Sequence, residues 1–417
     1  MALDYQDGRL SLDGLSLEAL AADFGTPLYV YSQAAMIDAA QQVDTALAGP
    51  TPHLVCYALK ANPSLAVIQT FARLGLGADV TSGGELFRAL RAGVPAAKVV
   101  FSGVGKTPAE LRAALDSGIR ALHVETEGEL AALNAIAGEL GRPAPIALRI
   151  NPDVDPHTHP KIATGMSENK FGLPWGEVLR IVEDIRKMPG LRLVGLSMHI
   201  GSQITRLDGF QEAARLVASL AADLLSAGVA LEYLDFGGGI GVRYADETPP
   251  SPAEWAGALR AVLGDLPLGL LAEPGRSLVA GSGVLITRVT GIKRTPAKTF
   301  VILDAAMNDL IRPMLYDAYH SIDPVLQRPG APVEPVDIVG PVCETTDTFA
   351  RGRDLPLPEP GDLLAIRQVG AYGMSMASNY NSRPRAAEVM ITADGAALPI
   401  RDRETYDDLV RGERLLP

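Results

Sequence analysis

The amino-acid sequence predicts two domains of different class: an α/β domain that forms a (β/α)8 TIM-type barrel, and a C-terminal β-sandwich or β-barrel domain. The barrel is predicted because eight short apolar runs alternate with amphipathic helical segments between residues 54 and 272, a rhythm typical of a parallel sheet. The β domain is predicted because strand-like runs separated by proline- and glycine-rich turns follow from about residue 280. We place the barrel at residues 27–280 and the β domain at residues 1–26 and 281–417.

The elements of the barrel follow one another in a regular order. A helix near residues 16–23 and a strand at 28–32 precede them. The eight apolar runs are residues 54–59, 77–80, 99–101, 121–124, 146–150, 193–199, 231–236 and 268–272. Helices are predicted between them at residues 84–92, 108–117, 127–140, 175–188, 210–227 and 252–263. Eight units fit a closed barrel, and a doubly wound open sheet is the alternative.

The β domain is predicted from runs that lack helical segments between them. These strand-like runs are residues 284–294, 299–303, 337–342, 362–368 and 387–391. The 42 glycines and 31 prolines of the chain show no period, so we interpret them as turns between many short elements.

Composition and charge exclude several classes of protein. Hydrophobic residues make up 47% and charged residues 21% of the sequence, which is close to the globular average. The net charge is −12, from 37 basic and 49 acidic side chains, and this argues against a nucleic-acid partner. No signal peptide and no uncharged apolar run of membrane-spanning length is visible. We therefore expect a cytoplasmic protein with no membrane partner.

The two cysteines, Cys56 and Cys343, lie far apart and form neither a disulfide framework nor a zinc pattern. Cys56 falls within an apolar run, where it is expected to be a small buried residue. The histidines of the loop sequence PHTHP, His157 and His159, have no third ligand at a matching spacing. We predict no metal site and expect this loop near the mouth of the functional site.

Polar residues collect where the predicted barrel strands end, which is the face that carries function in such barrels. One lysine, one histidine, several acids, two arginines and a glycine cluster follow the apolar runs. They are Lys60, Asp79, Ser102, Glu125, Arg149, His199, Gly237, Gly238, Gly239, Glu273, Gly275 and Arg276. Scattered polar residues are not expected to converge on one rim in this way.

Lys60 ends the first apolar run and is followed by Ala61, Asn62 and Pro63. A lysine at the lip of a buried strand can attack a carbonyl when burial lowers its pKa. Taken alone, it is better explained by a side-chain stem that packs on the strand while the ammonium reaches water. The glycine run after the seventh strand favours the reactive role of Lys60, because loops at this place commonly bind phosphate.

A lysine and a phosphate cradle on one rim together suggest pyridoxal phosphate. The ring nitrogen of this cofactor needs an acid beside it, and Glu273 is the candidate. A flat side chain against the ring is also needed, and His199 is the candidate. A histidine satisfied by a neighbouring carbonyl is an equally good reading of His199 alone. We add Asp79 to the expected cofactor-binding set.

Seven sequence motifs, in order, resemble one known family. They are YALKAN, HIGSQ, DFGGG, AEPGRS, MNDLIRPMLYDAYH, GPVCETTD and GAYGMSMASNYN, and together they are similar to the diaminopimelate decarboxylases. This family belongs to the fold-type III pyridoxal-phosphate enzymes. The resemblance implies that Lys60 binds the cofactor covalently, that His199 stacks on its ring, and that Glu273 pairs with its ring nitrogen. It also implies that Ser202, Gly238, Gly275 and Arg276 surround the phosphate, with Tyr372 nearby.

The resemblance also implies a substrate site and a partner. Arg276, Arg312 and Tyr316 would hold the distal carboxylate of the substrate, with Tyr372 also in contact. The active sites would be shared within a head-to-tail homodimer, so that Cys343 and Glu344 enter from the partner subunit. Cys343 would donate a proton, and Glu344 would face the distal amine.

The expected activity is the decarboxylation of meso-2,6-diaminopimelate to L-lysine and CO2, the last step of lysine biosynthesis. Arg312 agrees with it, because a bidentate guanidinium suits a distal carboxylate. The alternatives are a related decarboxylase of arginine, ornithine or lysine, and a non-catalytic homologue that binds pyridoxal phosphate.

Overall fold

The computed structural model describes residues 3–155, 164 and 169–417 of the chain. The chain divides into two compact units. The barrel unit comprises Ile37–Arg243 and Glu247–Leu278. The β unit comprises Met1–Met36, Tyr244–Asp246 and Val279–Pro417. The predicted histidines His157 and His159 lie outside the described residues.

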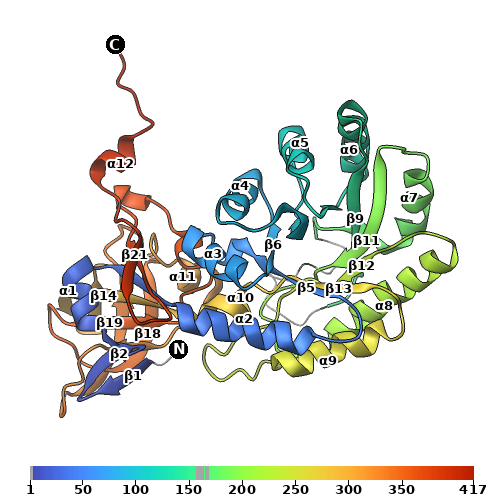
Figure 1. The fold of residues 1–417 in the computed structure, drawn as a ribbon. Coiled ribbons are helices and arrows are strands. Elements are labelled where there is room, and N and C mark those ends of the chain that lie inside the picture. The colour runs from blue at the N-terminus through green and yellow to red at the C-terminus, as the bar shows by residue number, and fades with distance from the viewer. Residues whose placement is uncertain (1–2, 156–163, 165–168) are drawn as a thin grey trace. The chain divides into compact units, whose positions relative to one another are not determined.

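Eight parallel strands close into a barrel among the described residues of the barrel unit (Figure 1). Each strand pairs with its neighbour, and the last pairs with the first through Leu270, Leu271 and Ala272 beside His53, Leu54 and Val55. The strands are β5 (His53–Ala58), β6 (Gly77–Val80), β7 (Val99–Phe101), β8 (Ala121–Val124), β9 (Ala144–Asn151), β11 (Leu191–Met198), β12 (Tyr233–Asp235) and β13 (Gly269–Ala272). Closure confirms the predicted barrel and excludes the open sheet.

Amphipathic helices connect these strands and surround the barrel (Figure 1). They are α3 (Leu65–Arg73), α4 (Gly83–Arg91), α5 (Pro108–Ser117), α6 (Glu127–Leu140), α7 (Val178–Ile185), α8 (Asp208–Ser226) and α9 (Pro252–Leu263). Their ends follow local sequence signals. Helix α5 begins in a capping box between Thr107 and Glu110 and ends at Gly118 in the left-handed conformation, where glycine carries no steric penalty.

The interior of the barrel is packed with side chains from successive strands. Small and branched residues form one buried cluster: Cys56, Val100, Ala121, Ala147, Val194, Tyr233 and Leu271. Cys56 is fully buried, as predicted. Because this layer fills the barrel, ligands are admitted only toward the ends of the strands.

The β unit is rich in sheet, as predicted. Its largest sheet runs β18-β17-β15-β14-β4-β20-β21, with β19 paired to β14 and to β16. These strands are β4 (Leu28–Ser32), β14 (Gly283–Arg294), β15 (Thr299–Leu303), β16 (Ile322–Pro324), β17 (Val333–Val339), β18 (Thr348–Pro356), β19 (Leu363–Arg367), β20 (Ala387–Ile391) and β21 (Ala397–Arg401). A second, three-stranded sheet joins β1 (Leu3–Gln6), β2 (Arg9–Leu12) and β3 (Leu15–Ser16).

The first boundary between the units differs from the one we placed at residue 27. Strand β4 pairs with β14 and with β20, so it belongs to the β unit. The division falls within helix α2 (Gln33–Leu47), between Met36 and Ile37. All five residues of β4 are buried, and an apolar strand of this kind carries no local signal of the sheet that it joins.

Short helices complete the fold. They are α1 (Leu17–Phe24), α10 (Arg276–Val279), α11 (Arg312–Tyr316) and α12 (Tyr406–Val410). In the part of the chain that the structure describes, none of the helices combines the length and the apolar character needed to cross a membrane.

Candidate active site

Lys60 lies just beyond the end of β5, in a single 3-10 turn at Leu59–Ala61. Its Nζ donates a hydrogen bond to Oδ2 of Asp79 at 3.1 Å. Asp79 is fully buried on β6, whereas the Lys60 side chain is 37% exposed. The Asn62 side chain accepts a hydrogen bond from Ser64 N and turns the chain into α3. The lysine is therefore anchored at its head while remaining open to a ligand.

Glu273, at the end of β13, stands in a buried polar network. Ser102 Oγ donates to its Oε1 at 3.3 Å, and His123 Nδ1 lies 3.5 Å from the same oxygen. Burial raises the pKa of Glu273 well above its usual value, and the neighbouring charges of Asp235 and Asp79 add to the effect. Burial likewise raises the pKa of Asp235 to about 7, although a hydrogen bond from Gly237 N opposes it. This pair of carboxyls therefore retains a proton near neutral pH.

His123 is a neutral member of this network. Burial lowers its pKa to about 3, and the charge of Lys106 adds to the effect. Its ring lies 3.1 Å from Ser102 Oγ on one side and 3.3 Å from the Tyr233 hydroxyl on the other. A neutral imidazole between two hydroxyls positions Ser102 against Glu273 without adding a charge.

His199 follows β11 and faces the same pocket. Burial lowers its pKa well below the usual value, with the charges of Lys60 and Arg149 contributing. Its Nδ1 accepts a hydrogen bond from Gly238 N at 3.3 Å. A neutral ring held at one nitrogen is suited to stacking on a flat ligand, although the stacking itself stays a prediction.

The glycine run requires glycine because the backbone is crowded. A Cβ on Gly238 would lie 2.1 Å from the Glu273 carbonyl oxygen, and one on Gly239 would lie 2.1 Å from that of Gly201. Gly237 and Gly239 also have positive φ, of 65° and 95°. Two amides of the run, those of Gly237 and Gly238, donate to Asp235 and His199. The phosphate role predicted for Gly237, Gly238 and Gly239 stays a prediction.

Arg276 and Ser202 lie close together in the barrel unit. Arg276 Nη2 donates to Ser202 Oγ at 3.0 Å, and the guanidinium is buried. The preceding loop packs on the end of β5, since Ala58 N donates to Pro274 O and a Cβ on Gly275 would be 3.1 Å from the Ala58 Cβ. A buried guanidinium beside a hydroxyl is a good donor set for an anion.

A pocket of about 340 Å³ lies at the ends of the barrel strands. Its lining includes Lys60, Ser102, Arg149, Ser197, His199 and Glu273. The volume falls in the range of about 300–1,000 Å³ found for small-molecule sites. Within the described chain, the buried hydroxyl of Ser197 has no hydrogen-bond partner. An amine, a carboxyl whose pKa is raised by burial, an imidazole whose pKa is lowered by burial and an unsatisfied hydroxyl in one pocket fit pyridoxal phosphate.

The other predicted residues lie in the β unit. Arg312 and Tyr316 begin and end α11, and Arg312 is buried. Tyr372 has a positive φ of 57°. This backbone conformation is uncommon for a residue other than glycine.

Cys343 and Glu344 lie on an ordered, exposed loop of the β unit. Cys343 N donates to Asn381 Oδ1 at 2.9 Å, and Glu344 accepts from the Tyr380 hydroxyl at 2.8 Å. Asp347 fixes the base of the loop by accepting from Val342 N and Met307 N. The Cys343 thiol is exposed, so it is not part of a core.

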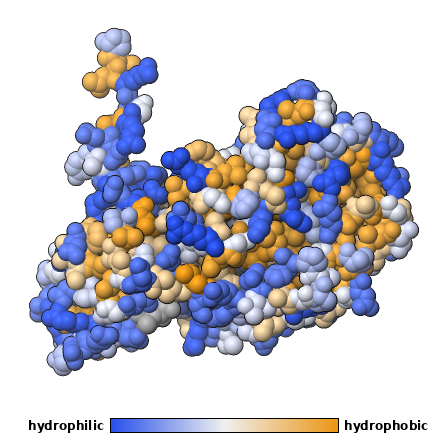
Figure 2. Space-filling model, viewed as in Figure 1, coloured by the Kyte–Doolittle hydropathy of each residue, from blue (hydrophilic) through white to orange (hydrophobic). Residues whose placement is uncertain are grey.

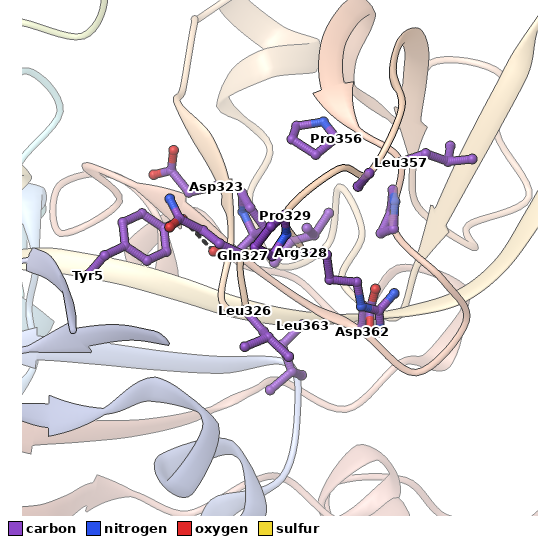
Figure 3. A pocket seen from close by; sticks show the side chains of 14 residues that line it. Tyr5, Asp323, Leu326, Gln327, Arg328, Pro329, Pro356, Leu357, Asp362 and Leu363 are labelled. Carbon is purple, nitrogen blue, oxygen red and sulfur yellow. Dashed lines mark hydrogen bonds and ion pairs between the residues drawn. The ribbon is translucent and has the colours of Figure 1, made fainter. Parts of the chain in front are cut away.

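A larger pocket, of about 420 Å³, lies elsewhere in the β unit (Figure 3). Prolines and leucines form much of its wall, together with Tyr5 and Arg328. Arg328 is already paired with Glu359 and Asp362, and the Tyr5 hydroxyl donates to Pro324 O. Its lining holds no lysine, histidine or cysteine, so we do not regard it as the reaction site.

Four groups of the site were not assigned a role from the sequence: His123, Tyr233, Asp235 and Ser197. All four lie on predicted strands, in the runs 121–124, 193–199 and 231–236. The signal that could have found them is a polar side chain inside an otherwise apolar strand, since such a group requires a buried partner.

Comparison with known proteins identifies the class. The family model described as pyridoxal-dependent decarboxylase, pyridoxal binding domain, matches residues 33–280. This segment contains Lys60 and the pocket around it. The chain is thus a member of the pyridoxal-dependent decarboxylases, and its cofactor is pyridoxal phosphate, as predicted.

Relatives that are similar over the full length identify the family within this class of decarboxylases. The chain is 49% identical to diaminopimelate decarboxylase of Pseudomonas aeruginosa over 413 residues, covering 99% of both chains. It also matches the crystal structure of diaminopimelate decarboxylase from M. jannaschii with L-lysine, at TM-score 0.93 and 40% identity, covering 100% of this chain and 98% of that one. The Helicobacter pylori enzyme with L-lysine matches at TM-score 0.91 and 44% identity, covering 94% and 98%. The chain therefore belongs to the diaminopimelate decarboxylase family, which confirms the resemblance.

Proposed function

We propose that this chain decarboxylates meso-2,6-diaminopimelate to L-lysine and CO2 with pyridoxal phosphate as cofactor. One observation carries the proposal: Lys60, His199 and Glu273 line one pocket, and burial raises the pKa of Glu273 well above its usual value. When bound, the cofactor supplies an aldehyde for a lysine and a ring that withdraws electrons from the bond to the lost carboxylate. The full-length similarity to diaminopimelate decarboxylases supports the particular substrate.

The side chains of the pocket have separate tasks in this proposal. Lys60 binds the cofactor covalently, and Asp79 holds its ammonium before binding. Glu273 holds a proton toward the ring nitrogen, while His199 lies against the face of the ring. Ser202, the glycine run Gly237–Gly239, Gly275 and Arg276 hold the phosphate.

The β unit supplies the groups for the far end of the substrate. We assign the distal carboxylate to Arg312, together with Arg276 and Tyr316, and the distal amine to Glu344. Tyr372 completes the contacts with the ligand. Cys343 Sγ then delivers the proton that replaces the lost carboxylate. The exposure of Cys343 and the burial of Arg312 on the same unit support different tasks for the two residues.

We infer that two copies of the chain form a head-to-tail homodimer in which Cys343 and Glu344 complete the partner's pocket. The exposed thiol supports this arrangement, because it stands ready for contact with another surface. The C-terminal segment also exposes hydrophobic side chains (Figure 2), among them Tyr406, Val410, Leu415 and Leu416. Apolar surface of this kind is commonly covered by a partner.

We place the enzyme in the cytoplasm. Both cysteines are free in the described chain, and an exposed thiol such as that of Cys343 persists best in a reducing compartment. The biosynthetic reaction proposed for the chain agrees with this location.

A substrate comparison tests the proposed function. The purified, cofactor-loaded enzyme should release CO2 from meso-diaminopimelate and form L-lysine in equal amount, with little release from lysine, ornithine or arginine. Arg312→Ala should reduce kcat/KM for diaminopimelate by roughly 10²-fold or more, because a charged bidentate contact is lost. Faster release from ornithine or arginine would favour the alternative decarboxylases. No release from any substrate would favour the non-catalytic homologue.

A further inference from the structure

We propose that His320 is a positioning residue that holds the Arg312 guanidinium in place for the distal carboxylate of the ligand. This inference rests on the proposed function, which gives Arg312 that carboxylate. It assigns the strength of carboxylate binding to a histidine outside the pocket of the barrel unit.

The hydrogen bonds of His320 determine its form. Its Nδ1 lies 2.8 Å from the carbonyl oxygen of Arg367, which can only accept, so Nδ1 carries the proton. Its Nε2 lies 2.8 Å from Arg312 Nη1, which can only donate, so Nε2 carries none. These two contacts define one neutral tautomer of the ring. Both residues are buried, at 1% exposure for His320 and 5% for Arg312, so water does not replace either contact.

The Tyr244 ring supports the same guanidinium from another direction. Arg312 Cζ lies 4.6 Å from the centre of this ring, a cation–π distance. The Tyr244 and His320 rings meet edge to face at 5.3 Å. The guanidinium is therefore held at one nitrogen by an imidazole and across its plane by an aromatic ring, which limits its rotation.

The neutral character of these partners matters for function. A buried arginine is more commonly paired with a carboxylate, which would neutralise it and compete with an incoming anion. The imidazole and the phenol ring bear no charge, so neither of these two contacts neutralises the positive charge of Arg312. Two charged groups near His320 are Arg353, which donates to the His320 carbonyl oxygen, and Arg367, which pairs with Asp323. The rings of His320 and Tyr244 thus orient the Arg312 guanidinium without neutralising it.

Two ligands that differ only in the distal carboxylate test the proposal. L-lysine carries this carboxylate, and cadaverine is the same chain with the carboxylate removed. Dissociation constants of both should be measured by calorimetry on the cofactor-loaded wild type, His320→Ala, His320→Gln and Arg312→Ala. KM and kcat for diaminopimelate should be measured on the same four proteins.

His320→Ala should weaken lysine binding by roughly 10-fold or more, the effect of losing a hydrogen bond to a charged group. Cadaverine binding should stay within about twofold, because it has no group for Arg312. KM should rise much more than kcat falls. His320→Gln should recover part of the lysine affinity, since its amide offers one acceptor and one donor.

The outcomes separate this inference from the proposed function. Equal weakening of lysine and cadaverine, or no change in either, would overturn the role of His320. If Arg312→Ala also leaves the ratio of the two affinities unchanged, the assignment of Arg312 to the distal carboxylate fails instead. If His320→Ala does not fold, as judged by circular dichroism, His320→Gln decides. In His320→Gln, a lysine-to-cadaverine affinity ratio shifted toward that of Arg312→Ala supports the role of His320. An unchanged ratio, or a loss of affinity shared by both ligands, contradicts it.

Discussion

Lys60→Ala is expected to remove the visible absorbance of the lysine-bound cofactor and to lower kcat by at least roughly 10³-fold. The amine is the group that forms the covalent bond, and alanine leaves no replacement at the end of β5. Absorbance spectra and CO2 release on protein reconstituted with pyridoxal phosphate measure both effects.

A second lysine of the barrel unit gives a matched control. Lys98 precedes β7 and donates its Nζ to Gly75 O, so it lies at the opposite ends of the parallel strands from Lys60. Lys98→Met should keep the absorbance and the activity. Retention of the visible band in Lys60→Ala would show that another amine carries the cofactor.

Mixing two inactive variants is expected to restore activity if the pocket is shared between subunits. Lys60→Ala and Cys343→Ala each damage every site, the second by about 10²–10⁴-fold as a lost proton donor. In mixed dimers, one of the two sites receives intact Lys60 and intact Cys343. Equal amounts of the two chains, refolded together or allowed to exchange, should therefore regain about a quarter of the wild-type activity.

The control for this experiment pairs two variants of the same unit. Lys60 and His199 both line the pocket of the barrel unit, so no mixed dimer of Lys60→Ala and His199→Ala contains a complete site. This mixture should stay inactive. If the Lys60 and Cys343 variants exchange subunits, as shown by native mass spectrometry of tagged chains, and activity does not return, the shared-site proposal is wrong.

Much of the barrel could be predicted from the sequence because local sequence signals mark where its helices and strands begin and end. Strands β6, β7 and β8 and helices α5, α6 and α9 have the bounds that the pattern predicts. The helix starts carry strong caps, such as Ser251 with Glu254 at α9, and the strands are short apolar runs. Such signals depend only on neighbours in the sequence.

The β unit was harder to predict because its pairings are long-range. Strand β4 joins β14 and β20 from positions more than two hundred residues away. Strand β18 was missed because its sequence, TFARGRDLP, mixes charged residues and a glycine with apolar ones. Register shifts in its pairing with β17 also disrupt the alternation that marks a strand.

The candidate site likewise combines residues that local sequence patterns predict with contacts between residues far apart in the sequence. The strand-end rule placed Lys60, Asp79, His199 and Glu273 on one rim, and the pocket of the barrel unit contains three of them, with Asp79 bonded to Lys60. The contacts that tune these groups come from several strands and could not be read locally. His123 meets Ser102 and Tyr233, and Arg312 meets His320 and Tyr244, only once the chain has folded.

The most direct test of the central claim, that Lys60 carries the cofactor, is borohydride reduction followed by peptide mapping. Reduction makes the link between lysine and cofactor permanent, and mass spectrometry of a digest then locates the labelled residue. Two other lysines provide internal comparison: Lys170 lines the same pocket, and Lys106 is held by Glu129 and two carbonyl oxygens nearby. We expect the pyridoxyl group on the peptide that contains Lys60 and on neither of the other two. A label on Lys170 or Lys106, with Lys60 unmodified, would contradict the assignment of the active site.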